Sequence, residues 1–181
     1  MQATLLSILG LALLGALHAQ GDAPVQADFQ EKQFTGKWYS IGLASNSNWF
    51  KDKKHLMKMC TTVVSATADG NLEVTSTYPK ADECKKVEMH FQQKGQVGHY
   101  STTGEEGEQD LYVVETDYEH YAIVSSIRES GKKPSTTLQL YMRGQDVSPQ
   151  LLKKFKELCL TMGLTDDMLV VMPKSGEWQH G

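Results

Sequence analysis

The chain of 181 residues carries 18 basic and 22 acidic side chains, a formal net charge of -4, and 40% of its residues are hydrophobic. Charges of both signs are interspersed, so no basic stripe is available to neutralise phosphates, and we expect no nucleic-acid partner. Beyond the first residues, no run reaches the ~18 consecutive apolar residues that a membrane span needs, so we expect no transmembrane segment.

The N-terminal stretch MQATLLSILGLALLGALHAQ is an apolar run without Asp, Glu, Lys or Arg that ends in small residues around Ala19. Such a run is typical of a secretory signal peptide. We therefore predict that residues 1–19 are a signal peptide and that residues 20–181 form one domain, since about 160 residues suffice for a single core. The expected product is a secreted, extracellular monomer that passes through the endoplasmic reticulum and Golgi.

Short β-prone runs fill most of the remaining chain. The first, residues 36–46, is apolar on both faces, as in a buried strand. Residues 61–68 and 72–78 are separated by Asp69-Gly70-Asn71, a hairpin turn signal, and the second run alternates between two faces. Further runs lie at residues 87–92, 97–102, 111–115, 121–126 and 136–142. Many evenly spaced short strands predict an all-β sandwich or barrel.

One helix is predicted after the last of these strands. Ser148 can cap it, Pro149 occupies its first turn, and Gly163 ends it. Its apolar stripe consists of Leu151, Leu152, Phe155, Leu158, Cys159 and Met162. An amphipathic helix of this kind should lie against the outside of the sheet. A final apolar run, residues 168–172, stops before Pro173 and could add one more strand.

Three signatures occur in a specific order along the chain: Gly36-Lys37-Trp38, Thr116-Asp117-Tyr118, and Arg143 before the helix. Together they resemble the lipocalin family, over nearly all of the mature chain. The resemblance implies an eight-stranded antiparallel up-and-down β-barrel with one C-terminal flanking α-helix. It also implies structural roles for Trp38, which would plug the closed end, and Arg143, which would stack on the indole as a cation–π contact.

Within that family, the segments GKWYSIGLASNSNWFKDKK, MKMC and VVETDY are similar to the lipocalins that isomerise prostaglandin H2 to prostaglandin D2. The resemblance implies that Cys60 is a reactive cysteine inside the cavity. The group's hydroxyls around that thiol match Ser40, Thr62 and Ser76. Two further cavity positions of the group match Lys54 and Tyr141. Strand alternation adds Val74, Tyr78 and Leu138 or Leu140 as apolar ligand-binding positions.

The expected chemistry needs a thiol with thiolate character, donors for the released oxyanion and an apolar pocket. Cys60 with Ser40, Thr62 and Ser76 supplies these groups by residue type. Three alternatives stay open: a carrier of retinoids, fatty acids or bile pigments, an interaction protein that displays loops, and a Cys60 that is only a small buried hydrophobe. Lys54 lies in a charged run that is also typical of a solvated loop.

No metal-ligand spacing is present, so we expect neither a metal nor a bound cofactor, and a free thiol such as glutathione is the expected addition for turnover. The related isomerases pair a cysteine matching Cys84 with one in the tail, but the tail PKSGEWQHG has none. Cys84 can then pair only with Cys159 if Cys60 is reserved for catalysis. The alternative for Cys159 is a packed thiol on the helix.

Overall fold

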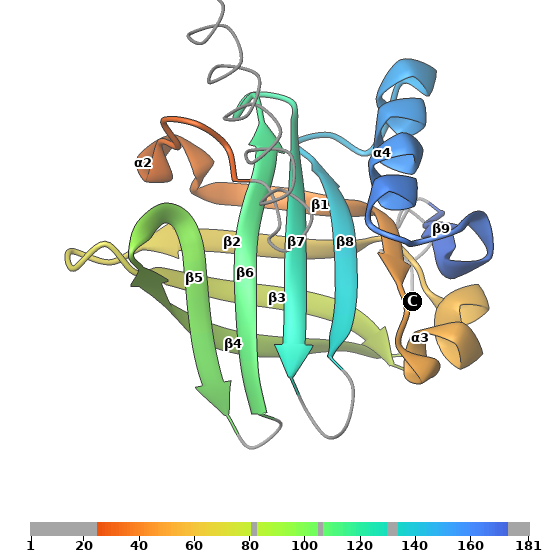
Figure 1. Ribbon diagram of the computed structural model, residues 1–181, viewed down its shortest axis with the longest axis horizontal. Helices are drawn as coiled ribbons and strands as arrows, with labels where there is room; N and C mark the ends of the chain where they lie inside the picture. Colours follow the sequence, from red (N-terminus) through yellow and green to blue (C-terminus); the bar gives the residue numbers. More distant parts are fainter. Residues whose placement is uncertain (1–24, 81–82, 105–106, 130–133, 174–181) are drawn as a thin grey trace, which may run out of the picture.

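A computed structural model describes residues 25–80, 83–104, 107–129 and 134–173, so the predicted signal peptide lies outside the described residues. The strands are β1 (Gly36–Ser45), β2 (Cys60–Ala66), β3 (Leu72–Lys80), β4 (Glu83–Lys94), β5 (Gln96–Gly104), β6 (Gly107–Thr116), β7 (Tyr121–Glu129), β8 (Ser135–Met142) and β9 (Leu169–Val171). Strands β2 to β8 pair with one another in chain order, and β1 pairs with both β8 and β2, which closes an antiparallel barrel (Figure 1).

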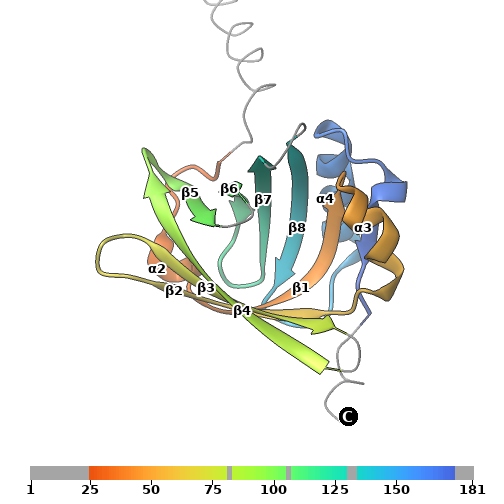
Figure 2. The same ribbon diagram turned by 90° about the horizontal axis from the view of Figure 1, so that it is seen from below.

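Helix α4 (Pro149–Thr161) lies outside the barrel, beside β1 and β9 (Figure 2). The predicted barrel with one C-terminal flanking helix is therefore confirmed. Three short elements were not expected: α2 (Glu31–Phe34), α3 (Asn48–Lys53) and the 3-10 turn η1 (Lys54–Leu56). A second 3-10 turn, η2 (Asp166–Met168), precedes β9. Among the described helices, none is long and apolar enough to cross a membrane.

Strand β1 has two halves with different partners. Its first half, from Gly36 to Ser40, pairs with β2, and its second half, from Gly42 to Ala44, pairs with β9. The pairing with β8 shifts register between Ser40 and Gly42, which marks a β-bulge at Ile41. A bulge bends a strand and changes which side chains face inward. The first half thus faces the barrel interior, while the second half contributes to the contact with the helix.

The outer core lies between α4 and the barrel. Its fully buried members include Ile41, Ala44, Leu138, Leu140, Phe155 and Cys159. A Cβ on Gly42 would lie 3.0 Å from Phe155 Cε2, so the phenyl ring packs directly on the strand backbone. Burial raises the pKa of the Cys159 thiol to about 12, with a smaller contribution from Asp166. Cys159 is a free thiol, so the Cys84–Cys159 disulfide that the sequence left open is not formed.

The closed end of the barrel is built around Trp38 and Arg143. The guanidinium Cζ lies 3.6 Å from the centre of the indole ring, which is 1% exposed. Arg143 also donates hydrogen bonds of 2.9–3.0 Å to the backbone carbonyls of Gln33, Thr35, Lys37 and Tyr118. These bonds connect α2, β1 and the turn between β6 and β7. One side chain thus holds three separate parts of the chain together.

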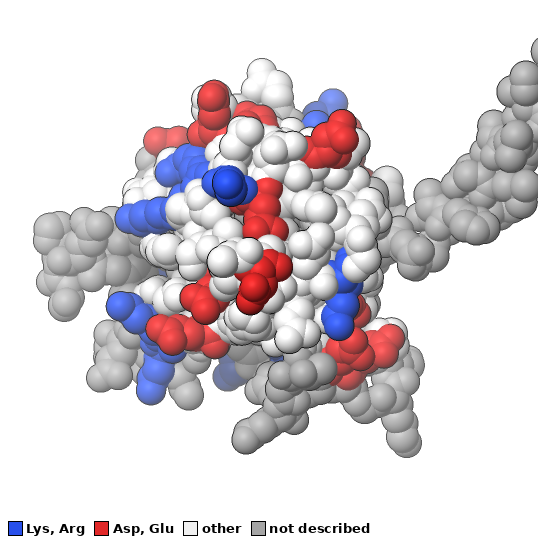
Figure 3. Space-filling model, turned by 90° about the vertical axis from the view of Figure 1, so that its left-hand side faces the viewer, with Lys and Arg blue, Asp and Glu red and all other residues white. Residues whose placement is uncertain are grey.

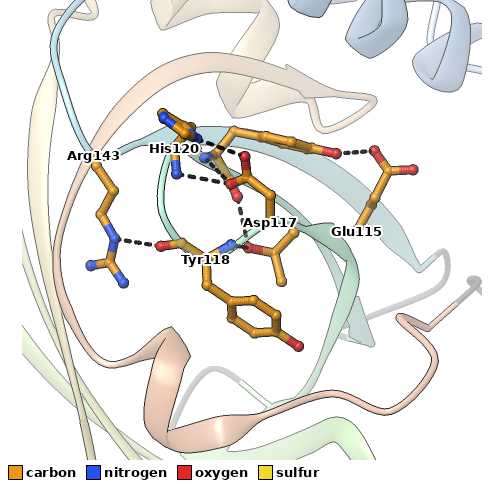
Figure 4. A network of polar contacts seen from close by, with 7 residues as sticks. Glu115, Asp117, Tyr118, His120 and Arg143 are labelled. Atoms are coloured by element: carbon orange, nitrogen blue, oxygen red, sulfur yellow. Dashed lines mark hydrogen bonds and ion pairs between the residues drawn. The ribbon is translucent and has the colours of Figure 1, made fainter.

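The turn from Thr116 to Tyr121 is ordered by Asp117. Its carboxylate accepts hydrogen bonds from the backbone N–H groups of His120 (2.8 Å) and Tyr121 (2.9 Å) and faces the His120 ring (Figure 4). This network holds Tyr118 at φ 67°, a left-handed conformation that non-glycine residues seldom adopt. The strained residue presents its carbonyl to Arg143, so the turn and the closed end depend on each other.

The helix is also attached by charge. Lys154 on α4 pairs with the carboxylate of Glu115 on β6, and the Tyr121 hydroxyl donates to the same carboxylate at 2.6 Å. Elsewhere on the surface, the face shown in Figure 3 carries interspersed side chains of both charge signs.

We predict that Arg143→Ala lowers the free energy of unfolding by about 3 kcal/mol. It removes four charge-assisted hydrogen bonds and a cation–π contact, whose separate contributions do not simply add. Arg143→Lys keeps the charge but loses the planar fork, so it should destabilise less than Arg143→Ala. Urea unfolding followed by circular dichroism measures both. Equal stability of wild type and Arg143→Ala would show that the closed end does not depend on this side chain.

We predict that low pH destabilises the turn from Thr116 to Tyr121, because Asp117 becomes protonated. Burial acts to raise the pKa of this carboxyl, but the hydrogen bonds from Tyr121 and His120 outweigh it and hold the pKa below its usual range. An unfolded Asp titrates near pH 3.9, so its stabilisation is fully present above about pH 4 and is lost as the pH falls through the lower folded value. Asp117→Asn should therefore be less stable than wild type at pH 7, with a difference that shrinks at pH 3.

The matched control is Glu119→Gln, which removes a negative charge from the same turn. Urea midpoints at pH 7, 5 and 3 should differ from wild type by much less for this control. A stability difference for Asp117→Asn that does not change with pH would contradict the assignment.

Candidate functional site

A cavity of about 110 Å³ lies inside the barrel, above Trp38. Its apolar lining includes Trp38, Val64, Val74, Met89, Phe91 and Leu111. Its polar lining consists of Thr62, Ser76, Gln109, Ser126, Gln139 and Tyr141. Sites for drug-sized ligands typically occupy about 300–1,000 Å³. A lipophile of that size can therefore enter only if lining side chains move or if part of it stays at the open end.

The strand register brings Cys60, Ser40 and Tyr141 together. Ser40 on β1 lies opposite Cys60 on β2, and on its other side opposite Tyr141 on β8. The Cys60 thiol is partly exposed and donates to the carbonyl of Lys58 at 3.3 Å. The three side chains thus form one row across three neighbouring strands.

A second row lies one step deeper in the barrel. Thr62 is opposite Trp38 on one side and opposite Ser76 on the other, and the Thr62 and Ser76 hydroxyl oxygens are 3.4 Å apart. Strand β2 is rich in β-branched residues, which favour extended backbone. Its alternation buries Thr62 and Val64 and leaves Val63 46% exposed. Cys60 has the same parity as Thr62, so this alternation directs both toward the interior.

Tyr141 connects the two rows. Burial raises the pKa of its phenol far above the ordinary value, a hydrogen bond with Thr62 lowers it, and the charge of Cys60 raises it again. The phenol therefore stays protonated at neutral pH and is a hydrogen-bond donor beside the thiol. The four residues that the sequence assigned to catalysis and the tyrosine assigned to ligand binding lie in one region of the barrel.

The other expected ligand-binding residues have different positions. Val74 lines the cavity, whereas Tyr78 lies on β3 opposite Lys85 and its side chain is outside the described part. Lys54 Nζ donates to the carbonyl of Asp167, which ties η1 to η2, and Lys54 is not among the residues that line the cavity.

The prediction that Leu138 lines the cavity is wrong. We expected it, or Leu140, to face the cavity, but both are buried in the outer core against α4. Strand β8 instead directs Gln139 and Tyr141 inward. The sequence alternates apolar and polar residues there, and in this strand the apolar face belongs to the helix contact. Hydrophobicity alone therefore identified the wrong face of β8.

Sequence reasoning also missed a polar group on the opposite wall. Gln109 Nε2 donates to the Ser126 hydroxyl, and Arg128 Nη2 donates to Gln109 Oε1 at 3.2 Å. The expected strand began at residue 111, which excluded Gln109, although β6 starts at Gly107. Alternation from Leu111 would have placed Gln109 on the inner face. Among the described residues, no group of three His, Cys, Asp or Glu side chains could hold a metal ion.

Comparisons with known proteins agree with this architecture. The sequence profile of the lipocalin / cytosolic fatty-acid binding protein family matches residues 35–176. A protein from Rhinella marina named lipocalin is 44% identical over 167 residues and covers 91% of each chain. A horse (Equus caballus) protein named prostaglandin-H2 D-isomerase is 38% identical over 178 residues and covers 92% of each chain.

A solved structure gives the same result for the fold. This structure is of the siderocalin Ex-FABP, a protein said to function through dual ligand specificities. It superposes on this chain with a TM-score of 0.71 at 33% sequence identity. The match covers 78% of this chain and 95% of that chain. Since the family profile and these relatives span most of the sequence, the chain belongs to the lipocalin family.

Proposed function

We propose that this chain is a secreted lipocalin that binds small lipophilic molecules in its barrel and isomerises prostaglandin H2 to prostaglandin D2 through Cys60. The observation that supports catalysis is the row of Cys60, Ser40 and Tyr141 above the Thr62–Ser76 pair. The horse relative named as this isomerase makes the reaction a reasonable assignment. No bound cofactor is needed, and a free thiol such as glutathione would keep Cys60 reduced.

The first half of the reaction opens the endoperoxide. The Cys60 thiolate attacks the ring oxygen on the carbon that becomes the ketone, so an S–O bond forms and the O–O bond breaks. The electron pair of that bond goes to the second oxygen, which takes up a proton and becomes the hydroxyl. Ser40, Thr62 and Ser76 would donate hydrogen bonds to this oxyanion, together with the protonated phenol of Tyr141.

The second half restores the thiolate. The carbon bonded to the sulfur-linked oxygen loses its hydrogen as a proton, and the C–H electron pair forms the C=O bond. The S–O bond breaks, and its electrons return to sulfur. No atom or electron is gained or lost overall, so the reaction is an isomerisation. The apolar walls around Val74 would hold the two side chains of the substrate.

A second candidate function is a carrier without turnover, for retinoids, fatty acids or bile pigments. The relative that supports it is the Rhinella marina protein, which is named only lipocalin and is 44% identical. A carrier needs the cavity but not a reactive thiol. The two functions therefore differ in what the loss of Cys60 does.

We predict that Cys60→Ala abolishes conversion of prostaglandin H2 to D2, while the affinity for retinoic acid stays close to wild type because little apolar surface is lost. Thr62→Val keeps the side-chain volume and removes one donor, so turnover should fall about tenfold to a hundredfold. Product analysis with added glutathione measures turnover, and quenching of tryptophan fluorescence measures binding.

The matched control is Cys159→Ala, which removes a thiol from the outer core and should leave turnover unchanged in the folded protein. Wild-type turnover by Cys60→Ala would refute the catalytic role. Saturable binding by a wild type without any turnover would establish the carrier.

We also predict that iodoacetamide at pH 8 modifies Cys60 in the native protein but not Cys159. Cys159 is 1% exposed and burial raises its pKa to about 12, so it is neither reachable nor ionised, whereas Cys60 is partly exposed. A Cys84→Ser background leaves only these two thiols. Peptide mass spectrometry locates the label, and a saturating cavity ligand should slow labelling. Equal labelling of both in the native state would mean that the outer core opens readily.

A further inference from the structure

We propose that Gln139 on β8 and Ser126 on β7 form a polar subsite in the cavity wall that binds a hydroxyl group on the chain of a lipid, so that the barrel selects hydroxylated fatty acids over plain ones. The inference rests on the proposed ligand binding and goes beyond it. It assigns two side chains that the proposed chemistry does not use, and it names the class of lipid that they recognise.

Strand pairing places both side chains on the inner face of neighbouring strands. Gln139 lies opposite Val124, and Ser126 lies opposite Thr137, so Gln139 and Ser126 are diagonal neighbours. Both of them line the cavity. Diagonal neighbours on one face of a sheet are about 7–8 Å apart, which is within reach of a long side chain. The Gln139 amide can therefore approach the same point of the wall as the Ser126 hydroxyl.

Hydrogen bonds leave the Ser126 hydroxyl with a hydrogen to donate. Arg128 Nη2 donates to Gln109 Oε1 at 3.2 Å, so the amide nitrogen of Gln109 points the other way, where it donates to Ser126 Oγ. A serine hydroxyl that accepts one hydrogen bond still has its own hydrogen. Among the described residues, none accepts a hydrogen bond from Ser126 Oγ. This O–H group is therefore available to a ligand.

The amide of Gln139 is also available. Gln139 is half-buried, and its amide makes no hydrogen bond to another described residue. Ser125 Oγ is the one fully buried side-chain polar atom without a partner in the described part of the chain, so water must reach the Gln139 amide. An amide has two N–H donors and one carbonyl acceptor. A ligand hydroxyl can therefore donate to Gln139 Oε1 and accept from the Ser126 hydroxyl at once.

The hydroxyls near Cys60 are engaged with one another instead. The Thr62 and Ser76 hydroxyl oxygens are 3.4 Å apart, and Tyr141 forms a hydrogen bond with Thr62. Tyr141 is two residues beyond Gln139 on the same face of β8, about 7 Å further along the strand. A lipid held by its hydroxyl at Gln139 therefore lies beside the Cys60 row without competing for the donors there.

A plain alkyl chain at this point of the wall should bind less well than a hydroxylated chain. The plain chain displaces water from the amide and the hydroxyl without replacing their hydrogen bonds, and unpaired polar groups are unfavourable in an apolar site. A hydroxyl on the chain replaces both bonds. Sites that hydrogen-bond a hydroxyl of their ligand reject the analogue that lacks it for the same reason.

The test compares stearic acid with 10-hydroxystearic and 12-hydroxystearic acid, each used to displace cis-parinaric acid, whose fluorescence reports its own binding. Wild type should bind at least one hydroxy acid about tenfold more tightly than stearic acid. Gln139→Met keeps an unbranched side chain of similar length without the amide, so it should lose most of this preference while still binding stearic acid. Ser126→Ala should lower the preference about threefold, since the amide remains.

The matched control is Gln92→Met, the same replacement at an exposed position on β4, which should keep the preference. Unchanged preference for the hydroxy acids in folded Gln139→Met, or in Ser126→Ala should Gln139→Met not fold, would overturn the subsite but leave the proposed function standing. A wild type that binds stearic acid as tightly as both hydroxy acids would also overturn the subsite. Failure of wild type to bind any of these acids, cis-parinaric acid included, would overturn the proposed ligand binding as well.

Discussion

The bulge at Ile41 in β1 is the constraint on which both cores of the protein depend. Before it, Trp38 and Ser40 face the interior, and the strand is paired with β2. After it, Gly42 and Ala44 face the helix and the strand is paired with β9 in place of β2, while β8 pairs with both halves. A straight β1 could not bring Ser40 beside Cys60 and also offer its bare Gly42 backbone to Phe155. The position of the thiol row is therefore coupled to the packing of α4 through one strand.

The interior combines apolar walls with polar side chains that bind one another. Thr62 contacts Ser76 and Tyr141, and Gln109 contacts Ser126 and Arg128. Because buried polar groups are costly without partners, such pairing lets hydroxyls and amides line a cavity at little expense in stability. Among the described side chains, the one buried polar atom without a hydrogen bond is Ser125 Oγ, which lies on the helix side of β7 rather than in the cavity.

The sequence predicted the fold better than the site. The alternating runs, the Ser148 cap and the ordered signatures were sufficient for the barrel and its helix, because these features are local. It was harder to predict which side of a strand each residue faces. Leu138 was assigned to the cavity because it is apolar, but where a helix covers the outside of a barrel, the outer face of a strand is hydrophobic as well as the inner face. Gln109 was missed because the expected strand began at residue 111, and because its hydrogen bonds with Ser126 and Arg128 depend on pairing between β6 and β7, which is not visible in either run alone.

In the proposed function, ligand binding and catalysis would depend on different groups of the barrel interior. Affinity for a lipophile comes mainly from apolar surface on several strands, and a cysteine side chain contributes little of it. The proposed catalysis depends instead on one sulfur atom with donors held in place around it. The Cys60 row provides such donors only while β1, β2 and β8 keep their register, which the Arg143 contacts at the closed end help to fix. If Cys60 acts as proposed, a change that perturbs the barrel near β2 would therefore abolish turnover before it abolishes ligand binding.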